Sequence, residues 1–252
     1  MTKIAICGCC GKMGKVVADT ISKRKDCKVV AGIDVFGEKY TDFPVYKNIF
    51  DCNEQVDVII DFSHPSALQD MINFAKNKNI AVVVATTGLD DNQIKFIEET
   101  SKVIPVFFTY NMSLGVNLLA DLATKAAKVL GGDFDVEIVE AHHNQKIDAP
   151  SGTAIMLADA VTKGLEGEYH YEYDRHSKRQ KRDSKEIGMH AIRGGTIVGE
   201  HSIMFAGRDE IITLSHSARS KEIFAVGAVN AALFLKDKSP ALYSMKDLIS
   251  AQ

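Results

Sequence analysis

The sequence predicts an α/β protein with two domains, and three observations lead to this prediction. In the first half of the 252-residue chain, short apolar runs alternate with helix-like segments, which is typical of a parallel sheet with helices on both faces. After Asp133 apolar residues alternate with polar ones, which indicates a second, mixed and largely antiparallel sheet covered on one face. The last apolar helix, Lys221–Leu235, follows this pattern, and we expect it to return to the first domain. We therefore expect one domain at 1–112 and 221–252, with an α+β domain at 113–220 inserted into it.

The apolar runs of the first half are rich in β-branched residues and predict strands buried on both faces. They lie at Lys3–Cys7, Lys28–Ile33, Val56–Asp61, Ile80–Thr86 and Val103–Phe108. Helices are predicted between and after them at Lys12–Lys23, Pro65–Lys76, Asp90–Ser101 and Ser113–Leu130. Gly131-Gly132 can end the last of these helices in the left-handed conformation.

The second half begins with a predicted strand at Phe134–Ala141 and a helix at Ser151–Leu165. A polar segment with six Lys/Arg between Arg175 and Lys185 follows. We interpret it as a solvated flexible loop rather than a binding patch, although residues at its edges could cover a ligand as a lid. Two hairpins are then expected, with a two-residue turn at Gly194-Gly195 and a longer turn at Gly207-Arg208-Asp209.

Composition limits the classes of partner and compartment. The net charge of −3 does not suggest a nucleic-acid or membrane partner. No apolar run approaches the roughly 20 residues that span a bilayer, and the N-terminus does not resemble a signal peptide, so we expect a cytoplasmic protein. The five cysteines are odd in number and lie early in the chain. This favours reduced thiols over a disulfide framework, and their spacing disfavours a metal site.

A glycine-rich loop joins the first strand to the first helix. Gly8, Gly11 and Gly14 have the spacing G-x-x-G-x-x-G, one residue longer at its first step than the usual dinucleotide fingerprint. Gly8 would form the tight turn, Gly11 would let the backbone approach a pyrophosphate, and Gly14 would let the helix pack on the sheet. The free N–H groups of the helix start favour an anion. The pattern predicts a Rossmann-like dinucleotide-binding domain.

The choice of nucleotide rests on Asp34, which lies twenty residues after Gly14 at the end of the second predicted strand. A carboxylate there accepts hydrogen bonds from the ribose hydroxyls of NAD and disfavours the 2′-phosphate of NADP. Val35-Phe36 supplies no arginine for that phosphate, whereas Lys12 could supply a positive charge. We expect NADH as the preferred cofactor, with NADPH also accepted.

The segment Glu140–Ala154 concentrates the residues that can carry chemistry. His142 can donate a proton near neutral pH, and Lys146 and His143 can add charge-assisted hydrogen bonds to a carboxylate. Ser151 is a suitable helix N-cap that leaves the amides of Gly152 and Thr153 facing an anion. The segment predicts a site for a small dicarboxylate substrate, and adjacent histidines without a further ligand disfavour zinc.

This segment, E-A-H-H-N-Q-K-I-D-A-P-S-G-T-A, resembles the signature of the dihydrodipicolinate reductase family. Further blocks resemble the same family, in the same order along nearly the whole chain. They are Gly8–Gly14, Ala85–Gly88, Asn111–Asn117, Arg193–His201 and Phe224–Ala228.

The resemblance implies that hydride passes from a nicotinamide to a cyclic imine dicarboxylate in the diaminopimelate route of lysine biosynthesis. It implies that His142 is the general acid, that Lys146 is a second proton donor, and that His143, Gly152 and Thr153 bind substrate. It also implies a homotetramer formed through the sheets of the inserted domain. The residues it assigns to the cofactor are Gly8, Cys9, Cys10, Gly11, Lys12, Met13, Asp34, Ala85, Thr86, Thr87, Thr109, Tyr110, Asn111 and Met112.

Some positions depart from the commonest family pattern and bear on cofactor preference. They are Cys9-Cys10, Asp34-Val35, Met112 and Asn144. Two alternatives stay open at this point: a nicotinamide oxidoreductase with another substrate, and a non-catalytic nucleotide sensor on the same fold. Neither would need an anion site beside His142 and Lys146.

Overall fold

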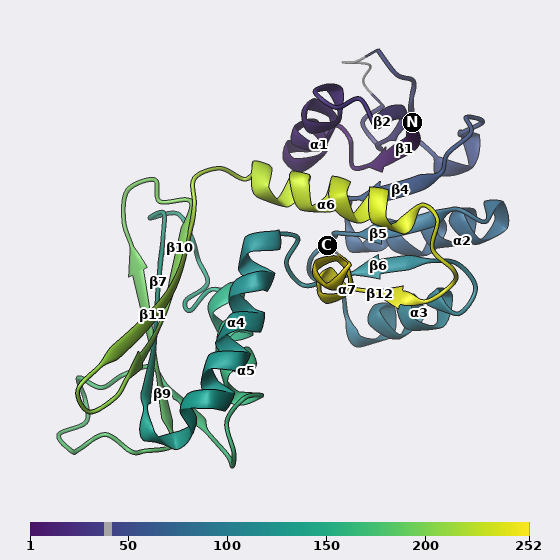
Figure 1. Cartoon of the computed structure of the whole chain (residues 1–252). Helices are drawn as coiled ribbons and strands as arrows, with labels where there is room; N and C mark the ends of the chain where they lie inside the picture. The colour runs from purple at the N-terminus through teal and green to yellow at the C-terminus, as the bar shows by residue number, and fades with distance from the viewer. Residues whose placement is uncertain (38–41, 252) are drawn as a thin grey trace. The chain divides into compact units, whose positions relative to one another are not determined.

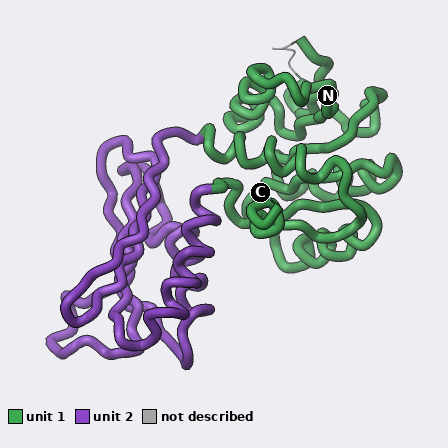
Figure 2. Tube along the Cα trace, in the orientation of Figure 1, with its two compact units in different colours: residues 1–114, 222–252 green, residues 115–221 purple. Residues whose placement is uncertain are grey.

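The computed structural model describes residues 1–37 and 42–251, and these form two compact units (Figure 2). Unit 1 contains residues 1–114 and 222–252, and unit 2 contains residues 115–221. Unit 2 is therefore an insertion in the chain of unit 1. Among the described residues, no helix is both long enough and apolar enough to cross a membrane.

Unit 1 is built on a seven-stranded sheet in the order β12-β6-β5-β4-β1-β2-β3 (Figure 1). Every neighbouring pair is parallel, as the buried apolar runs predict. Without β12, this is the order of dinucleotide-binding doubly wound folds. The strands are β1 (Thr2–Cys7), β2 (Cys27–Ile33), β3 (Val45–Tyr46), β4 (Val58–Asp61), β5 (Ala81–Val84), β6 (Val106–Phe108) and β12 (Leu242–Tyr243).

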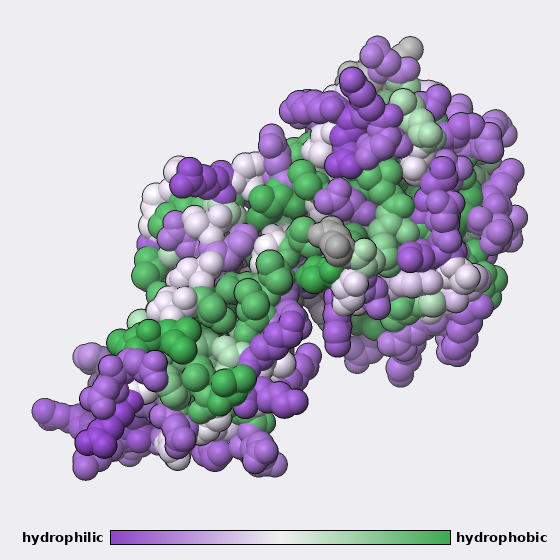
Figure 3. Space-filling view, viewed as in Figure 1, coloured by the Kyte–Doolittle hydropathy of each residue, from purple (hydrophilic) through white to green (hydrophobic). Residues whose placement is uncertain are grey.

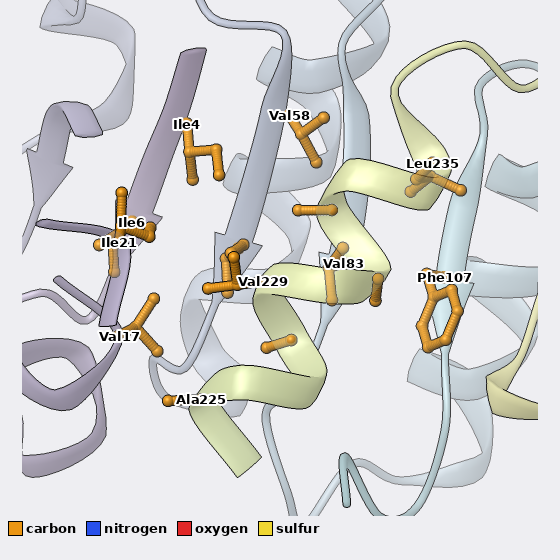
Figure 4. Close-up of a cluster of buried hydrophobic side chains, with 14 of the residues drawn as sticks. Ile4, Ile6, Val17, Ile21, Val58, Val83, Phe107, Ala225, Val229 and Leu235 are labelled. Carbon is orange, nitrogen blue, oxygen red and sulfur yellow. The ribbon is translucent and has the colours of Figure 1, made fainter. Parts of the chain in front are cut away.

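Helices cover both faces of this sheet and enclose two apolar clusters. One cluster lies under α1 (Lys12–Ser22), α6 (Glu222–Leu235) and α7 (Met245–Ser250), and Figure 4 shows α6 across the strands that carry Ile4, Val58, Val83 and Phe107. The other lies under α2 (Leu68–Lys78) and α3 (Asp91–Ser101). Helix α6 is apolar all round and packs closely, because a Cβ at Gly227 would come within 1.7 Å of the Met112 carbonyl oxygen. Short 3-10 turns occur at η1 (Ile49–Asp51), η2 (Pro65–Ala67) and η3 (Gly131–Asp133).

Unit 2 contains a five-stranded mixed sheet in the order β11-β10-β7-β9-β8. Its strands are β7 (Asp135–His142), β8 (His170–Glu172), β9 (Glu186–Arg193), β10 (Gly199–Ala206) and β11 (Ile211–Ala218). One face is covered by α4 (Leu114–Leu130), which runs across the boundary between the units, and by α5 (Gly152–Thr162). Gly131 ends α4 with φ of +61°, as predicted for a left-handed cap.

The prediction of a two-residue hairpin at Gly194-Gly195 is wrong. Strands β9 and β10 do not pair with each other, because β7 lies between them, parallel to β9 and antiparallel to β10. The five residues 194–198 instead cross the end of β7. The second predicted turn is confirmed, since β10 and β11 pair antiparallel across residues 207–210.

The basic segment between β8 and β9 is held by ion pairs rather than left free in solvent. Arg175 binds Glu186 at 2.6 Å, Lys178 pairs with Glu172, and Arg182 lies 3.2 Å from Asp135. Asp135 begins β7 and His142 ends it, a separation of about 23 Å along an extended strand. The segment thus lies at the end of the sheet opposite His142, which argues against a lid over that residue.

Candidate active site

The carboxyl ends of five strands in unit 1 are aligned in register. Ile33, Cys7, Asp61, Val84 and Phe108 are consecutive partners across β2, β1, β4, β5 and β6. The residues that follow them therefore lie along one edge of the sheet, where ligands bind in open α/β folds. All the segments expected to line a cofactor begin at this edge: 8–13, Asp34, 85–87 and 109–112.

The glycine loop follows β1 and opens α1. Gly8 has φ of +75°, and a Cβ there would lie 2.6 Å from the Phe62 carbonyl oxygen. A Cβ at Gly14 would lie 2.1 Å from the Gly8 carbonyl oxygen, so only glycine lets the helix pack on the turn. Gly11 is the N-cap of α1, with no side-chain cap and no acidic residue in the first turn. The helix start is thus suited to hold a phosphate.

Asp34 is buried beside this loop and is bonded to it. Its carboxylate accepts hydrogen bonds from the backbone N–H of Cys10 at 2.9 Å and of Phe36 at 3.1 Å. A carboxylate next to a phosphate-type turn has the position needed to bind an adenosine ribose. The surroundings of the loop therefore fit a nicotinamide dinucleotide.

The next part of the edge depends on Asp61, which our sequence analysis did not select. Its fully buried carboxylate accepts from the Thr86 hydroxyl at 2.8 Å and from the Ser63 backbone N–H at 3.0 Å. Burial raises the pKa of Asp61 although these hydrogen bonds oppose the rise. Asp61 joins the end of β4 to the segment Ala85–Thr87. The sequence offered one signal for selecting Asp61, which is an acidic residue at the end of an apolar run.

The last segment of the edge, residues 109–112, follows β6. Tyr110 is exposed and Met112 is buried. The Asn111 side chain accepts from the Ser113 backbone N–H at 2.8 Å, which shapes the turn into α4.

Neither cysteine of the glycine loop forms a disulfide, nor do the other three cysteines. Ligand atoms of Cys9, Cys10 and Asp34 lie within 4.8 Å of one another. Burial and the adjacent Cys10 raise the pKa of the Cys9 thiol to about 12. The position of the loop at the start of α1 is what favours a nucleotide role for it.

In unit 2 the helix-covered face of the sheet changes character along its strands. Two rows of register partners at one end are apolar, and the next two rows are mostly polar. The apolar rows are Ile187–Val136–Phe205–Ile212 and Met189–Ile138–Ile203–Leu214. The polar ones are Ala191–Glu140–His201–His216 and the pair Arg193–His142. The polar residues that could carry chemistry thus lie on the same face of the sheet as the apolar core residues, farther along the strands.

Glu140 is the centre of the polar rows. Its side chain is fully buried and accepts from both Nη atoms of Arg193 at 2.7 Å, from His142 Nδ1 at 2.7 Å and from the Ser151 backbone N–H at 3.0 Å. Burial would raise the pKa of Glu140, but the hydrogen bonds from Arg193, His142 and Ser151 outweigh it and hold the pKa below its ordinary value. The carboxylate is therefore ionised.

Ser151 and His201 form the other side of the cluster. The Ser151 hydroxyl caps α5 by accepting from the Ala154 backbone N–H at 3.2 Å, and it lies 3.0 Å from His201 Nε2. The rings of His201 and His142 meet edge to face at 5.1 Å. Because Ser151 is buried with both its amide and its hydroxyl engaged, it holds the cluster together from the helix side.

The loop after β7 carries the remaining predicted site residues. Lys146 pairs with Asp148 at 2.8 Å, and its backbone N–H donates to the His143 carbonyl oxygen at 3.1 Å. Open space surrounds the position of a Cβ at Gly152, which with Thr153 begins α5. His142, His143, Lys146 and this helix start therefore belong to one short stretch around the end of β7.

Three further residues of this cluster were not selected as site residues from the sequence, although each lay in a block that resembled the family. They are Glu140, Arg193 and His201. Glu140 could have been selected because residues i and i+2 of a strand share a face, which places it beside His142. The partners on β9 and β10 required the strand order, which local sequence does not contain.

Comparison with known proteins decides the family. The model of the dihydrodipicolinate reductase N-terminus matches residues 2–112, and that of the dihydrodipicolinate reductase C-terminus matches residues 115–249. The chain belongs to the dihydrodipicolinate reductase family. It is 51% identical over 252 residues to the 4-hydroxy-tetrahydrodipicolinate reductase of Caldanaerobacter subterraneus subsp. tengcongensis, covering 99% of this chain and 98% of that one. Identity to the enzyme of the same name from Clostridium novyi is 42%, with full coverage of both chains.

Solved structures show the same fold. A dipicolinate-bound dihydrodipicolinate reductase from Paenisporosarcina sp. TG-14 has a TM-score of 0.81 at 24% identity, over 97% of each chain. A myo-inositol dehydrogenase from Lactobacillus casei, in complex with NAD(H) and myo-inositol, has a TM-score of 0.59 at 18% identity, covering 98% of this chain and 90% of that one. The resemblance stated from the sequence is thus confirmed, and the chain is a member of a family of dinucleotide-dependent reductases.

The buried histidine of the cluster gives a prediction for stability. Burial, with His142 nearby, lowers the pKa of His201 to about 4, whereas an unfolded histidine titrates at about 6.5. Between these values the unfolded chain binds the extra proton, so stability falls as pH falls, by up to about 1.4 kcal/mol per pH unit. We expect His201→Gln to reduce the loss of unfolding free energy between pH 7 and pH 5 by about 1–2 kcal/mol, measured by urea denaturation.

The exposed His176→Gln is the matched control and should keep the wild-type dependence on pH. If the unfolding free energies of the wild type and of His201→Gln depended equally on pH, His201 would not be held neutral in the folded protein.

Proposed function

We propose that this protein is a 4-hydroxy-tetrahydrodipicolinate reductase. It reduces the cyclic imine dicarboxylate to tetrahydrodipicolinate with NAD(P)H, in the diaminopimelate route of lysine biosynthesis. The observation that carries the proposal is the full-length similarity to relatives of that name, 51% identical in one case. The polar cluster of unit 2 and the dinucleotide-type edge of unit 1 supply the two chemical requirements of the reaction. Five cysteines without a disulfide are typical of a reducing compartment, so we propose that the protein lies in the cytoplasm.

In the proposed reaction the residues of unit 2 bind the substrate and supply the proton. His142 is the general acid, and Lys146 is a second donor that also pairs with a substrate carboxylate. His143 and the first amides of α5, at Gly152 and Thr153, bind the other carboxylate. Asp148 now holds Lys146 at 2.8 Å, and a substrate carboxylate would take its place as the partner of that ammonium group. The bound nicotinamide supplies the hydride.

In unit 1 the proposed roles follow the geometry of the edge. Gly8–Met13 hold the pyrophosphate at the start of α1, and Asp34 binds the adenosine ribose. Residues 85–87 and 109–112 line the nicotinamide end. We propose NADH as the preferred cofactor, because a buried carboxylate at position 34 accepts from ribose hydroxyls and repels a 2′-phosphate.

The reaction is tested with purified protein and substrate made from pyruvate and aspartate semialdehyde by the preceding synthase. We expect rapid, substrate-dependent loss of NADH absorbance. His142→Gln and Lys146→Ala should each lower kcat by about 10²–10⁴-fold, the usual contribution of general acid catalysis, with nucleotide affinity unchanged.

Lys181→Ala, an exposed lysine of the basic segment, is the control and should keep wild-type turnover. Wild-type turnover in both site variants would refute the assigned residues. Binding of both nucleotides without oxidation of either would favour a nucleotide sensor on this fold.

Cofactor preference is tested by Asp34→Ala. Losing hydrogen bonds to a charged acceptor should weaken NADH binding by about 10- to 100-fold, and NADPH binding much less, in fluorescence titrations of each nucleotide. Asp51→Ala removes an exposed carboxylate of the same unit and should change neither affinity. An equal loss for both nucleotides would refute the ribose role.

We further propose that the protein is a homotetramer assembled through unit 2. The uncovered face of its sheet carries Ser202, Met204 and Ser215 beside the charged Glu137 and Glu200, and Ser202 bonds Ser215 across β10 and β11 at 2.9 Å. On the other face of the sheet, helix α4 exposes Leu118 and Leu122, and Figure 3 shows apolar surface in the region of that helix. Light scattering should give four times the chain mass of 27.6 kDa, and a monomer mass at micromolar concentration would refute assembly.

A further inference from the structure

The geometry around Glu140 settles which nitrogen of His142 can exchange a proton. An ionised carboxylate only accepts hydrogen bonds, so His142 Nδ1, 2.7 Å from Glu140 Oε2, must carry the hydrogen. The other nitrogen, Nε2, is then the one that gains and loses a proton. A Cβ at Gly199 would lie 3.1 Å from Nε2, so glycine at this position leaves room beside that atom.

Arg193 makes this arrangement possible. Its two Nη atoms reach both carboxylate oxygens of Glu140, and one of them also donates to the Asp148 carbonyl oxygen at 2.7 Å. Arg193 therefore balances the buried charge and ties the loop that carries Lys146 to the same carboxylate. A buried carboxylate without such a partner would become protonated or reorganise.

We propose that Glu140 is a positioning residue of the reductase reaction: it fixes the hydrogen of His142 on Nδ1, directs Nε2 to the substrate as the proton donor, and is itself held by Arg193. The expected effect of Glu140 on turnover rests on the proposed function. The arrangement of the imidazole can be measured without turnover.

Several titratable and charged groups surround the His142 ring. They are Glu140 on its own strand, Arg193 on β9, His201 on β10 with His216 beyond it on β11, and Lys146 and Asp148 in the loop. Glu140 is the group bonded to the ring at Nδ1, so replacing it by glutamine removes the charged acceptor that fixes the hydrogen there.

The experiment compares Glu140→Gln with Glu186→Gln, which removes another buried glutamate of the same sheet that is paired with an arginine, Arg175. We expect Glu140→Gln to lower kcat by about 10²-fold with KM changed little. Glu186→Gln should leave both unchanged. In a His142→Gln background, Glu140→Gln should change kcat by less than about threefold, because coupled residues are not additive. A full additional loss in that background overturns the proposal.

A second measurement needs neither turnover nor a Glu140 variant. In wild-type protein with ¹⁵N-labelled histidine, the His142 signals, assigned by their loss in His142→Gln, should show hydrogen on Nδ1 and a bare Nε2 in the neutral ring. The opposite tautomer overturns the proposal even if Glu140→Gln does not fold. If the wild type shows this tautomer but does not oxidise NADH with the imine, the positioning survives and the proposed function fails.

Discussion

A carboxylate removed from water is stable only when hydrogen-bond donors surround it, and Glu140 has four. These donors come from β7 itself, from β9 and from the start of α5, so one buried charge fixes the mutual positions of three elements. Breaking such an arrangement by removing one partner commonly costs several kcal/mol, whereas an apolar substitute can be neutral. The two neighbouring rows of the same face are apolar, which shows that the sheet packs without charge there. The charge at the end of β7 is thus best explained by the residue it holds, His142.

At the edge of unit 1 a second buried carboxylate, that of Asp61, is likewise stabilised by hydrogen-bond donors. Its carboxylate joins the end of β4 to Thr86 after β5, as Asp34 joins the end of β2 to the glycine loop. Backbone and hydroxyl donors fix the loop at Asp61, and backbone donors fix the loop at Asp34. Parallel strands that end in register bring these loops together, and buried carboxylates then set their conformation.

Local patterns in the sequence were sufficient to predict much of the fold. The β-branched runs identified the long strands of the parallel sheet, and the cap glycine identified the end of α4. The strands β3, β8 and β12 have only two or three residues each and exist because a neighbouring edge is available for pairing. The glycine pair 194–195 carries the turn chemistry of a hairpin, but turn chemistry cannot show that β7 lies between the two strands. Arg193 is 53 residues from Glu140, so their pairing depends on strand order, which no local pattern contains.

The location of the polar rows has a consequence for how acid and base properties are divided among the histidines. His201 and His142 touch through their rings, yet only His142 faces a carboxylate directly, while burial lowers the pKa of His201 to about 4. The neutral ring of His201 therefore supports Ser151 and the start of α5 without adding a positive charge next to His142, the proposed proton donor. Glu140 and His201 thus hold the ring of His142 from two sides, one through a hydrogen bond to Nδ1 and the other through a ring contact.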